Sequence, residues 1–432
     1  MTRALLVAFL AAALYAPAGA AADRYPQTVM IDDVPAQVDD DGALAGVQVY
    51  LQGGLDRQTA VQNGFAALLG EVVARTPVAA GNAQLPLRDA IAALGAGLTV
   101  SVEPQDVRYY VEGRPAALHA ALAMLGGALA SPDFSHATVA SAKRALTARI
   151  IDANESPFGV VSAMLRSAYY PGSGAGFAPM GTQAVVANAS ADGVRRFWSD
   201  NYRGGGVTLA AAGHVDADLM RALHAAIANL PSGQPRQVTL KTHKPTDPPA
   251  RIVTHRDVGL PWVGMGFAAP AAGTKDFAAM LVVQAIIASL GRTDTIVSRP
   301  AALRPINAIY QYDVKPANFI IYSSGNSVQS ATSLREVFAA TDLLASKPLD
   351  ASVIGRYRTL AIGQFAIDNM TLEDRSALVG MTTRMGLDPD YPNAVLSAIE
   401  TVSPADVQRV VKDYLQKYTV ALILPRPTRE AH

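Results

Sequence analysis

The chain has 432 residues, half of them hydrophobic and 17% charged, which is typical of folded globular proteins and not of disordered ones. Equal numbers of basic and acidic residues, 36 of each, give a formal charge of zero, so the composition does not point to nucleic acid or a strongly anionic surface as a partner. The length exceeds one ordinary hydrophobic core and fits two domains of about 200 residues each. The sequence has no cysteine, which excludes disulfides and thiolate metal ligands.

The N-terminal segment predicts export. Residues 1–22 begin with a basic residue, Arg3, continue with an apolar run over 4–14, and end in small residues that form an A-x-A pattern. This order is typical of a secretory signal peptide cleaved after Ala20 or Ala22, and the apolar run is too short to span a bilayer. We therefore expect a periplasmic or secreted protein with no membrane span after cleavage of the signal.

The mature chain opens with two predicted strands and a helix. Residues 27–34 and 45–51 have the composition of strands, and the second of them ends at a pair of glycines. Residues 63–76 then predict an amphipathic helix, because apolar residues recur on one face at helical spacing. These apolar residues are Phe65, Leu68, Leu69, Val72 and Val73. The helix has a single carboxylate, Glu71.

The remaining elements of the first half alternate between helices and strands. A helix is predicted over 85–94, because it is closed by a glycine-rich turn. Residues 98–102 and 107–111 alternate like the two strands of a hairpin. Two more helices are predicted over 116–129 and 134–151.

The clearest organisational feature is an internal repeat. A capped amphipathic helix that leads into an apolar strand occurs twice. The two residues of each matching pair are as many positions apart in the sequence as Ser190 and Ser403 are. The other pairs are Val194 and Val407, Arg196 and Arg409, Phe197 and Val410, Asp200 and Asp413, Val207 and Val420, and Leu209 and Leu422. A repeat at about half the chain length indicates two homologous domains and not many small solenoid units.

A proline-rich polar segment, 236–250, predicts the linker between the two domains. We therefore expect an N-terminal domain over 23–235 and a C-terminal domain over 251–432. The longest later apolar run, 277–290, is too short to span a membrane and predicts a buried helix.

In their order and spacing, these segments resemble the M16 family of metallopeptidases, the insulinase and pitrilysin-like group, and specifically its short two-domain bacterial members. The resemblance covers nearly all of the mature chain and rests on residues 47–56, 64–76, 94–110, 170–171, 179–182, 197–216, 263–270, 290–291 and 306–312. It implies an α+β fold of two homologous domains. Each would be a mainly antiparallel sheet with helices packed on it, as in M16 (LuxS/MPP-like) metallopeptidase halves.

The zinc chemistry of that family is where the sequence departs. A zinc peptidase of this kind needs an HxxEH helix, in which two histidines bind the metal and a glutamate is the base, and a carboxylate ligand from elsewhere. Aligned on the helix over 64–76, the two histidine positions are Ala67 and Glu71, and the base position is Gly70. The family's further glutamate ligand would lie in the helix over 134–151, which contains no carboxylate. Its charged residues are Lys143, Arg144 and Arg149.

We therefore expect no metal and no catalytic residue in this chain. No two of its seven histidines lie three or four residues apart, and Glu71 alone is too few ligands for a divalent cation. The other interpretation of Glu71 is a surface or salt-bridged helix residue.

Two features of substrate binding are implied by the resemblance. The family supplies an arginine and a tyrosine from its second domain to hold the substrate and stabilise the oxyanion, and Arg304 and Tyr310 are the candidates here. The spacing is one residue short of the usual pattern and Pro305 is unexpected. Tyr312, Arg299 or simple core and rim roles therefore stay open.

The second feature is an edge strand to which an extended substrate adds by backbone hydrogen bonds. Its candidates are Thr99 and Val100. An ordinary sheet strand would show the same alternation of apolar and polar residues.

The resemblance implies a non-catalytic subunit that pairs, as a heterodimer, with an HxxEH-bearing M16 homologue. Zinc would then be in the partner chain, while this chain would contribute a wall of the cavity and the Arg/Tyr pair for peptide hydrolysis. Alone it is predicted to be inactive. The alternative is a non-enzymatic structural or peptide-binding subunit of a larger assembly, and a third interpretation is an independently active peptidase with an unusual site.

Overall fold

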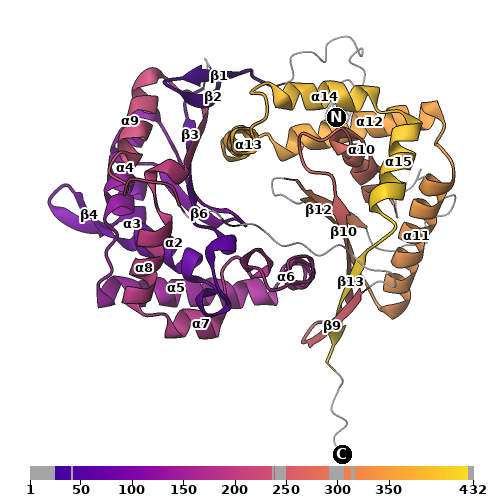
Figure 1. Cartoon of the computed structure of the whole chain (residues 1–432), viewed down its shortest axis with the longest axis horizontal. Helices are drawn as coiled ribbons and strands as arrows, with labels where there is room; N and C mark the ends of the chain where they lie inside the picture. The colour runs from indigo at the N-terminus through magenta and orange to yellow at the C-terminus, as the bar shows by residue number, and fades with distance from the viewer. Residues whose placement is uncertain are drawn as a thin grey trace, which may run out of the picture.

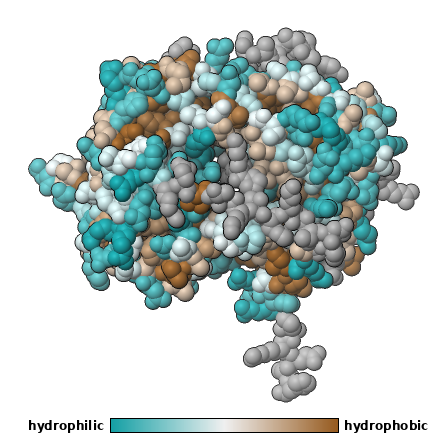
Figure 2. All heavy atoms as spheres, viewed as in Figure 1, coloured by the Kyte–Doolittle hydropathy of each residue, from teal (hydrophilic) through white to brown (hydrophobic). Residues whose placement is uncertain are grey.

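The computed structural model describes residues 25–39, 42–235, 238, 250–290, 306–312 and 317–426. The expected signal peptide and most of the expected linker lie outside these residues. Over the described ranges, none of the helices is long and apolar enough to cross a membrane. Figure 2 shows hydrophilic residues over the outer faces of both halves, with hydrophobic residues in scattered patches between them.

The first half of the chain forms a six-stranded sheet in the order β1-β2-β8-β3-β7-β6. All neighbours are antiparallel except β2 and β8, which are parallel. The strands are β1 Thr28–Ile31, β2 Val34–Val38, β3 Ala45–Gln52, β6 Gly97–Val102, β7 Asp106–Gly113 and β8 Val207–Gly213, and a separate small hairpin joins β4 Pro77–Ala80 to β5 Ala83–Pro86.

The second half forms a five-stranded sheet in the order β11-β12-β10-β13-β9. Again one neighbouring pair, β9 and β13, is parallel and the others are antiparallel. The strands are β9 Ala250–Arg256, β10 Trp262–Ala269, β11 Asn307–Gln311, β12 Ala317–Ser324 and β13 Thr419–Pro425. Without the edge strand β1, the first sheet has the order β2-β8-β3-β7-β6. These strands correspond one by one to β9-β13-β10-β12-β11 of the second sheet. The predicted α+β class with two mainly antiparallel sheets is confirmed.

The sequence repeat corresponds to a repeated helix and strand. Helix α8 (Ala191–Asn201) leads to β8, and helix α15 (Pro404–Tyr414) leads to β13. Each helix begins after a serine, because the Ser190 and Ser403 hydroxyl oxygens each accept a hydrogen bond from a backbone N–H three residues later, at 3.1 Å in both cases.

The other helices cover the sheets (Figure 1). In the first half they are α2 Phe65–Arg75, α3 Leu87–Ala93, α4 Pro115–Ala130, α5 His136–Glu155, α6 Pro157–Tyr169, α7 Gln183–Asn188 and α9 Ala217–Ile227. In the second half they are α10 Phe277–Ala288, α11 Ser327–Ser346, α12 Ala351–Asp368, α13 Leu372–Met385 and α14 Tyr391–Thr401. Helix α10 is buried along most of its length, as its uninterrupted apolar sequence predicts.

Both faces of the first sheet are covered. On β3, Val47, Val49 and Leu51 belong to the core that the sheet shares with the helices of its own half. Gln48 and Tyr50 point to the opposite face, because side chains alternate along a strand, and there they contact α13 of the other half. The sheet is therefore closed on its second face by a helix from the C-terminal half.

Each half has one helix that packs on the sheet of the other half (Figure 1). Helix α6 of the first half packs on β10 and β13, where Val161 and Leu165 form a small core with residues of the second sheet. Helix α13 of the second half packs on β2, β3 and β8. The halves are therefore joined by packed helices and not only by the linker.

Two local predictions were wrong. The single strand expected over 27–34 is the hairpin β1–β2, with Asp32 and Asp33 in the turn at φ values of 47° and 62°. Aspartate tolerates this left-handed backbone better than most residues. The helix expected to be amphipathic over 63–76 is α2, and every residue from Phe65 to Ala74 is buried.

Candidate functional site at helix α2

Helix α2 occupies the place predicted for a zinc helix, and its start is fixed by local contacts. Gly64, at the N-cap, has a φ of 118°, which only glycine adopts without strain. The Gln58 side-chain oxygen accepts hydrogen bonds from the backbone N–H of Gly64 and of Ala66 at 2.9 and 3.1 Å. These bonds satisfy donors that a helix N-terminus otherwise leaves unpaired.

The two small residues of α2 at the predicted zinc positions are packing residues. Ala67 is buried in the core of the first half and carries no ligand atom. Gly70 lies against β6, where an added Cβ would be 2.8 Å from Val100 Cγ1. The close approach of helix and strand therefore needs the glycine, and a glutamate base would require Val100 to move.

Glu71 is buried, with only 2% of its side chain exposed, and it is surrounded by three arginines. Its Oε1 accepts a hydrogen bond from Arg149 Nη1 of α5 at 2.7 Å. Its Oε2 contacts Arg88 Nη1 of α3 at 3.4 Å and pairs with Arg75, one turn later on α2. Both oxygens of the carboxylate are therefore occupied by guanidinium groups.

The charge state of Glu71 follows from two opposing effects. Burial alone would raise the pKa of its carboxyl group, but the positive charges of Arg88, Arg75 and Arg149 outweigh burial and bring the pKa below its usual value. The side chain is therefore ionised at neutral pH. Of the two structural interpretations, the salt-bridged residue is correct and the surface residue is wrong.

This arrangement does not fit a zinc ion. Zinc needs several nitrogen, sulfur or oxygen donors with free lone pairs, but Ala67 and Gly70 have none and both Glu71 oxygens already face arginine. The helix predicted to hold the further acidic ligand, α5, places Arg149 there, and its positive charge would repel a metal ion. Over the described ranges, no three histidine, aspartate or glutamate side chains gather closely enough to hold a metal.

The predicted substrate edge corresponds to β6, the end strand of the first sheet. Thr99 is exposed and Val100 is buried, and they pair with Tyr110 and Tyr109 of β7. The strand therefore has the position that addition of a peptide strand requires. Binding of a peptide there stays a prediction.

The predicted pairing of an arginine with Tyr310 stays a prediction. Arg304 and the alternative Arg299 lie outside the described residues. Tyr310 lies on β11, is 5% exposed, and its hydroxyl donates a hydrogen bond to the Pro270 carbonyl oxygen. Burial raises the pKa of Tyr310 above its usual range. Its ring contacts that of Tyr312, with centroids 5.3 Å apart.

Tyr310 also lines a cavity of about 310 Å³ between the halves, together with Tyr50, Arg108 and Arg384. The Arg384 guanidinium lies over the Tyr50 ring at 4.3 Å and pairs with Asp106 at 2.6 Å. The wall of this cavity is therefore built by β3 and β7 of the first half and by β11 and α13 of the second.

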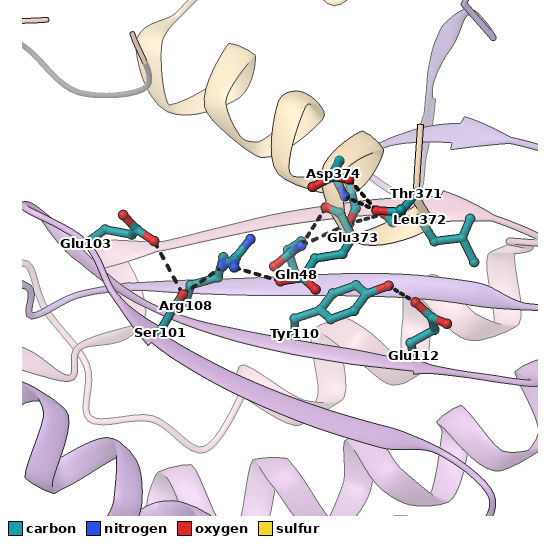
Figure 3. A network of polar contacts seen from close by, with 11 residues as sticks. Gln48, Ser101, Glu103, Arg108, Tyr110, Glu112, Thr371, Leu372, Glu373 and Asp374 are labelled. Atoms are coloured by element: carbon teal, nitrogen blue, oxygen red, sulfur yellow. Dashed lines mark hydrogen bonds and ion pairs between the residues drawn. The ribbon is translucent and has the colours of Figure 1, made fainter. Parts of the chain in front are cut away.

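A polar network joins the first sheet to the start of α13 (Figure 3). Arg108 Nη2 of β7 pairs with Glu373 Oε1 at 2.8 Å. Gln48 Nε2 of β3 donates to Ser376 Oγ at 2.9 Å and to the Glu373 carbonyl oxygen at 3.2 Å. This network was not predicted from the sequence, although polar residues at alternate positions of two apolar strands indicate a second, polar contact face.

Comparisons with known proteins agree with this fold. Residues 188–359 match the model of the peptidase M16 inactive domain, a segment that does not include α2. No curated protein matches the chain. A protease from Helicobacter pylori is 16% identical, with a TM-score of 0.77 over 92% of this chain and 99% of that one.

Two further solved structures share the fold. A peptidase M16 inactive domain from Pseudomonas fluorescens is 15% identical, with a TM-score of 0.75 over 93% of this chain and 98% of that one. A chain of complex III2 from Candida albicans is 14% identical, with a TM-score of 0.72 over 92% and 95%. Fold and site thus define an α+β protein of two similarly built halves. These neighbours show the fold, and residues 188–359 are similar to the peptidase M16 inactive domain.

Proposed function

We propose that this chain is the exported, non-catalytic subunit of a heterodimeric zinc peptidase, paired with an M16 homologue that carries HxxEH. The observation that carries the proposal is the combination of a complete M16-type fold with Glu71, buried among three arginines, at a zinc-ligand position. A chain of this kind keeps the fold that forms one wall of the shared cavity. It lacks the zinc ligands and the glutamate base that would activate water.

In the proposed complex, zinc and the catalytic base come from the partner. This chain supplies a wall of the shared cavity, and Arg304 and Tyr310 hold the substrate backbone there. Because the Tyr310 hydroxyl donates to Pro270 in this structure, the proposal requires that it exchange this partner for the substrate. The exposed edge of β6, at Thr99, offers backbone groups to an extended peptide.

The test is co-expression of the tagged chain with an exported HxxEH homologue from the same organism. We expect a complex with one zinc, located in the partner, that cleaves peptides, whereas the purified chain alone binds no stoichiometric zinc and cleaves none. Arg304→Ala should lower activity by about 10²-fold without weakening assembly, which is the typical cost of a lost oxyanion-stabilising group. Arg299→Ala, made in parallel, tests the alternative arginine, because a loss of activity there and not in Arg304→Ala would assign the role to Arg299. One zinc per chain in the isolated protein would refute the proposal.

The second candidate is a structural or peptide-binding subunit of a larger assembly. It is favoured by the similarity to a chain of complex III2 from Candida albicans. Recovery of the tagged chain from its native host separates the two functions. An HxxEH homologue in the purified material supports the peptidase, and a multi-subunit assembly without one supports the second candidate.

A further inference from the structure

The cluster around Glu71 has more positive than negative charge. We call Arg75, Arg88 and Arg149 the arginine cluster, and each of them pairs with Glu71. Three guanidinium groups therefore face one carboxylate. Within the described parts of the chain, no other acidic side chain forms an ion pair with any of the three.

The cluster reaches from the protein interior to the solvent. The exposed side-chain fraction is 2% for Glu71 but 21% for Arg75, 36% for Arg88 and 48% for Arg149. A guanidinium has five N–H donors, and the contacts to Glu71 use only one nitrogen of each arginine. Each guanidinium group therefore keeps N–H donors that do not contact Glu71, and the Glu71 carboxylate contacts all three side chains.

The neighbouring acidic residues do not neutralise this excess over the described ranges. Asp89 follows Arg88 on α3 and Asp152 lies one turn after Arg149 on α5, and both are exposed. Neither forms an ion pair with the cluster there. A local excess of guanidinium donors is thus present in a protein whose formal net charge is zero.

The position of the cluster indicates what kind of molecule would reach it. Gly70, the residue before Glu71, packs directly against Val100 of β6, and α3, which carries Arg88, also packs on β6. Because β6 is the end strand of its sheet, two of the helices that carry the cluster, α2 and α3, pack on the strand to which an added peptide would pair.

We infer that the arginine cluster is a binding site for a carboxylate group of a peptide, either an acidic side chain or a free C-terminus. Guanidinium groups pair with carboxylates through two parallel N–H···O bonds, which are stronger and more directional than ammonium contacts. Glu71 prearranges the three guanidinium groups, so little side-chain freedom is lost when the ligand binds. The inference depends only on these residues and holds whether or not a peptidase partner exists.

The test uses the full chain without any partner and a set of Gly/Ser peptides whose blocked N-termini carry an uncharged BODIPY fluorophore. One peptide ends in a glutamate with an amidated terminus, one in a glutamine with a free terminus, and one in a glutamine with an amidated terminus. Fluorescence anisotropy should show about tenfold tighter binding of one or both carboxylate peptides than of the neutral peptide, as expected for a charge-assisted contact. The first two peptides distinguish a side chain from a C-terminus. The preference should weaken as salt is added.

Variants locate the site. Arg88→Gln combined with Arg149→Gln should reduce the carboxylate preference to that of the neutral peptide. Arg144→Gln is the matched control, because Arg144 is exposed on the same helix α5, and it should leave the preference unchanged. Arg149→Lys keeps the charge and loses the planar fork, so it should bind at an intermediate level.

Equal binding of all three peptides, or equal losses for Arg144→Gln and the double variant, would overturn the inference. A melting curve of each variant checks that it is folded. If the double variant does not fold, the single Arg149→Gln variant takes its place, because nearly half of that side chain is already in water. An unchanged carboxylate preference in that folded variant would also overturn the inference.

Discussion

Glu71→Gln tests whether the buried carboxylate stabilises the fold. The amide has nearly the same shape, but it removes the negative charge that three guanidinium groups share. Breaking a fully buried ion pair costs about 3–5 kcal/mol. Here the arginines are partly exposed and water can hydrate them again, and the amide oxygen still accepts one hydrogen bond. We therefore expect the free energy of unfolding to fall by about 2 kcal/mol.

The size of the effect on melting depends on how the halves unfold. Unfolding entropy is about 2.1 cal/mol/K per residue. A loss of about 2 kcal/mol therefore lowers the melting temperature by about 5 °C if a half of about 200 residues melts alone, and by about 2 °C if the halves melt together. Because α6 and α13 each pack on the sheet of the other half, we expect the halves to melt together and the melting temperature to fall by the smaller amount. Calorimetry of both proteins measures the shift, and Glu155→Gln, an exposed change at the end of α5, should change stability by less than about 0.5 kcal/mol.

The same variant predicts a pH dependence. The arginines lower the pKa of Glu71 in the folded protein despite the opposing effect of burial, so the unfolded chain, with a pKa of about 4.3, binds the proton more readily. The extra stability of the wild-type protein is therefore fully present above the unfolded pKa and is lost as the pH falls through the folded pKa. A difference between wild type and Glu71→Gln that stays constant down to about pH 3, or an equal loss in Glu155→Gln, would refute the reasoning.

The remaining prediction concerns the contact between α6 and the second sheet. Gly264→Ala should lower the free energy of unfolding by about 1–3 kcal/mol through overpacking, because the new Cβ would lie 2.2 Å from Val161 Cγ1. Gly259→Ala is the control, since nothing lies within 4 Å of the position of its Cβ, and urea titration of both variants measures the difference. Equal stability of the two variants would show that α6 does not press against β10 at this position.

The repeat made the two-sheet fold predictable, but not the exchange of helices between the halves. Matching residues such as Ser190 and Ser403 mark the same helix and strand in each half, and both serines cap their helices. A sequence pattern shows which helix face is apolar, but it does not show which sheet that face will cover. The contact of α13 with Tyr50 depends on Gly380, where an added Cβ would lie 2.4 Å from the ring.

The residues that share helix α2 were predictable from the sequence, but only one of the ion pairs of Glu71 was. The resemblance placed Ala67, Gly70 and Glu71 on one helix, and the pairing of Glu71 with Arg75 follows from their spacing of one turn. Arg149 is 78 residues away from Glu71 in the sequence, so periodicity could not pair them. Burial of all three positions at once also depends on tertiary packing.

The excess of positive charge around Glu71 bears on both the proposed function and the inferred carboxylate site. A zinc site surrounds a cation with neutral and anionic donors, whereas this site surrounds an anion, Glu71, with cations. Arg149 stands on the helix from which a metal would need an acidic ligand, so restoring the two histidines alone would still leave a positive charge facing the metal. The same guanidinium groups that disfavour a metal attract carboxylates. In the proposed heterodimer, this position would therefore hold an acidic part of the substrate while the reaction takes place in the other chain.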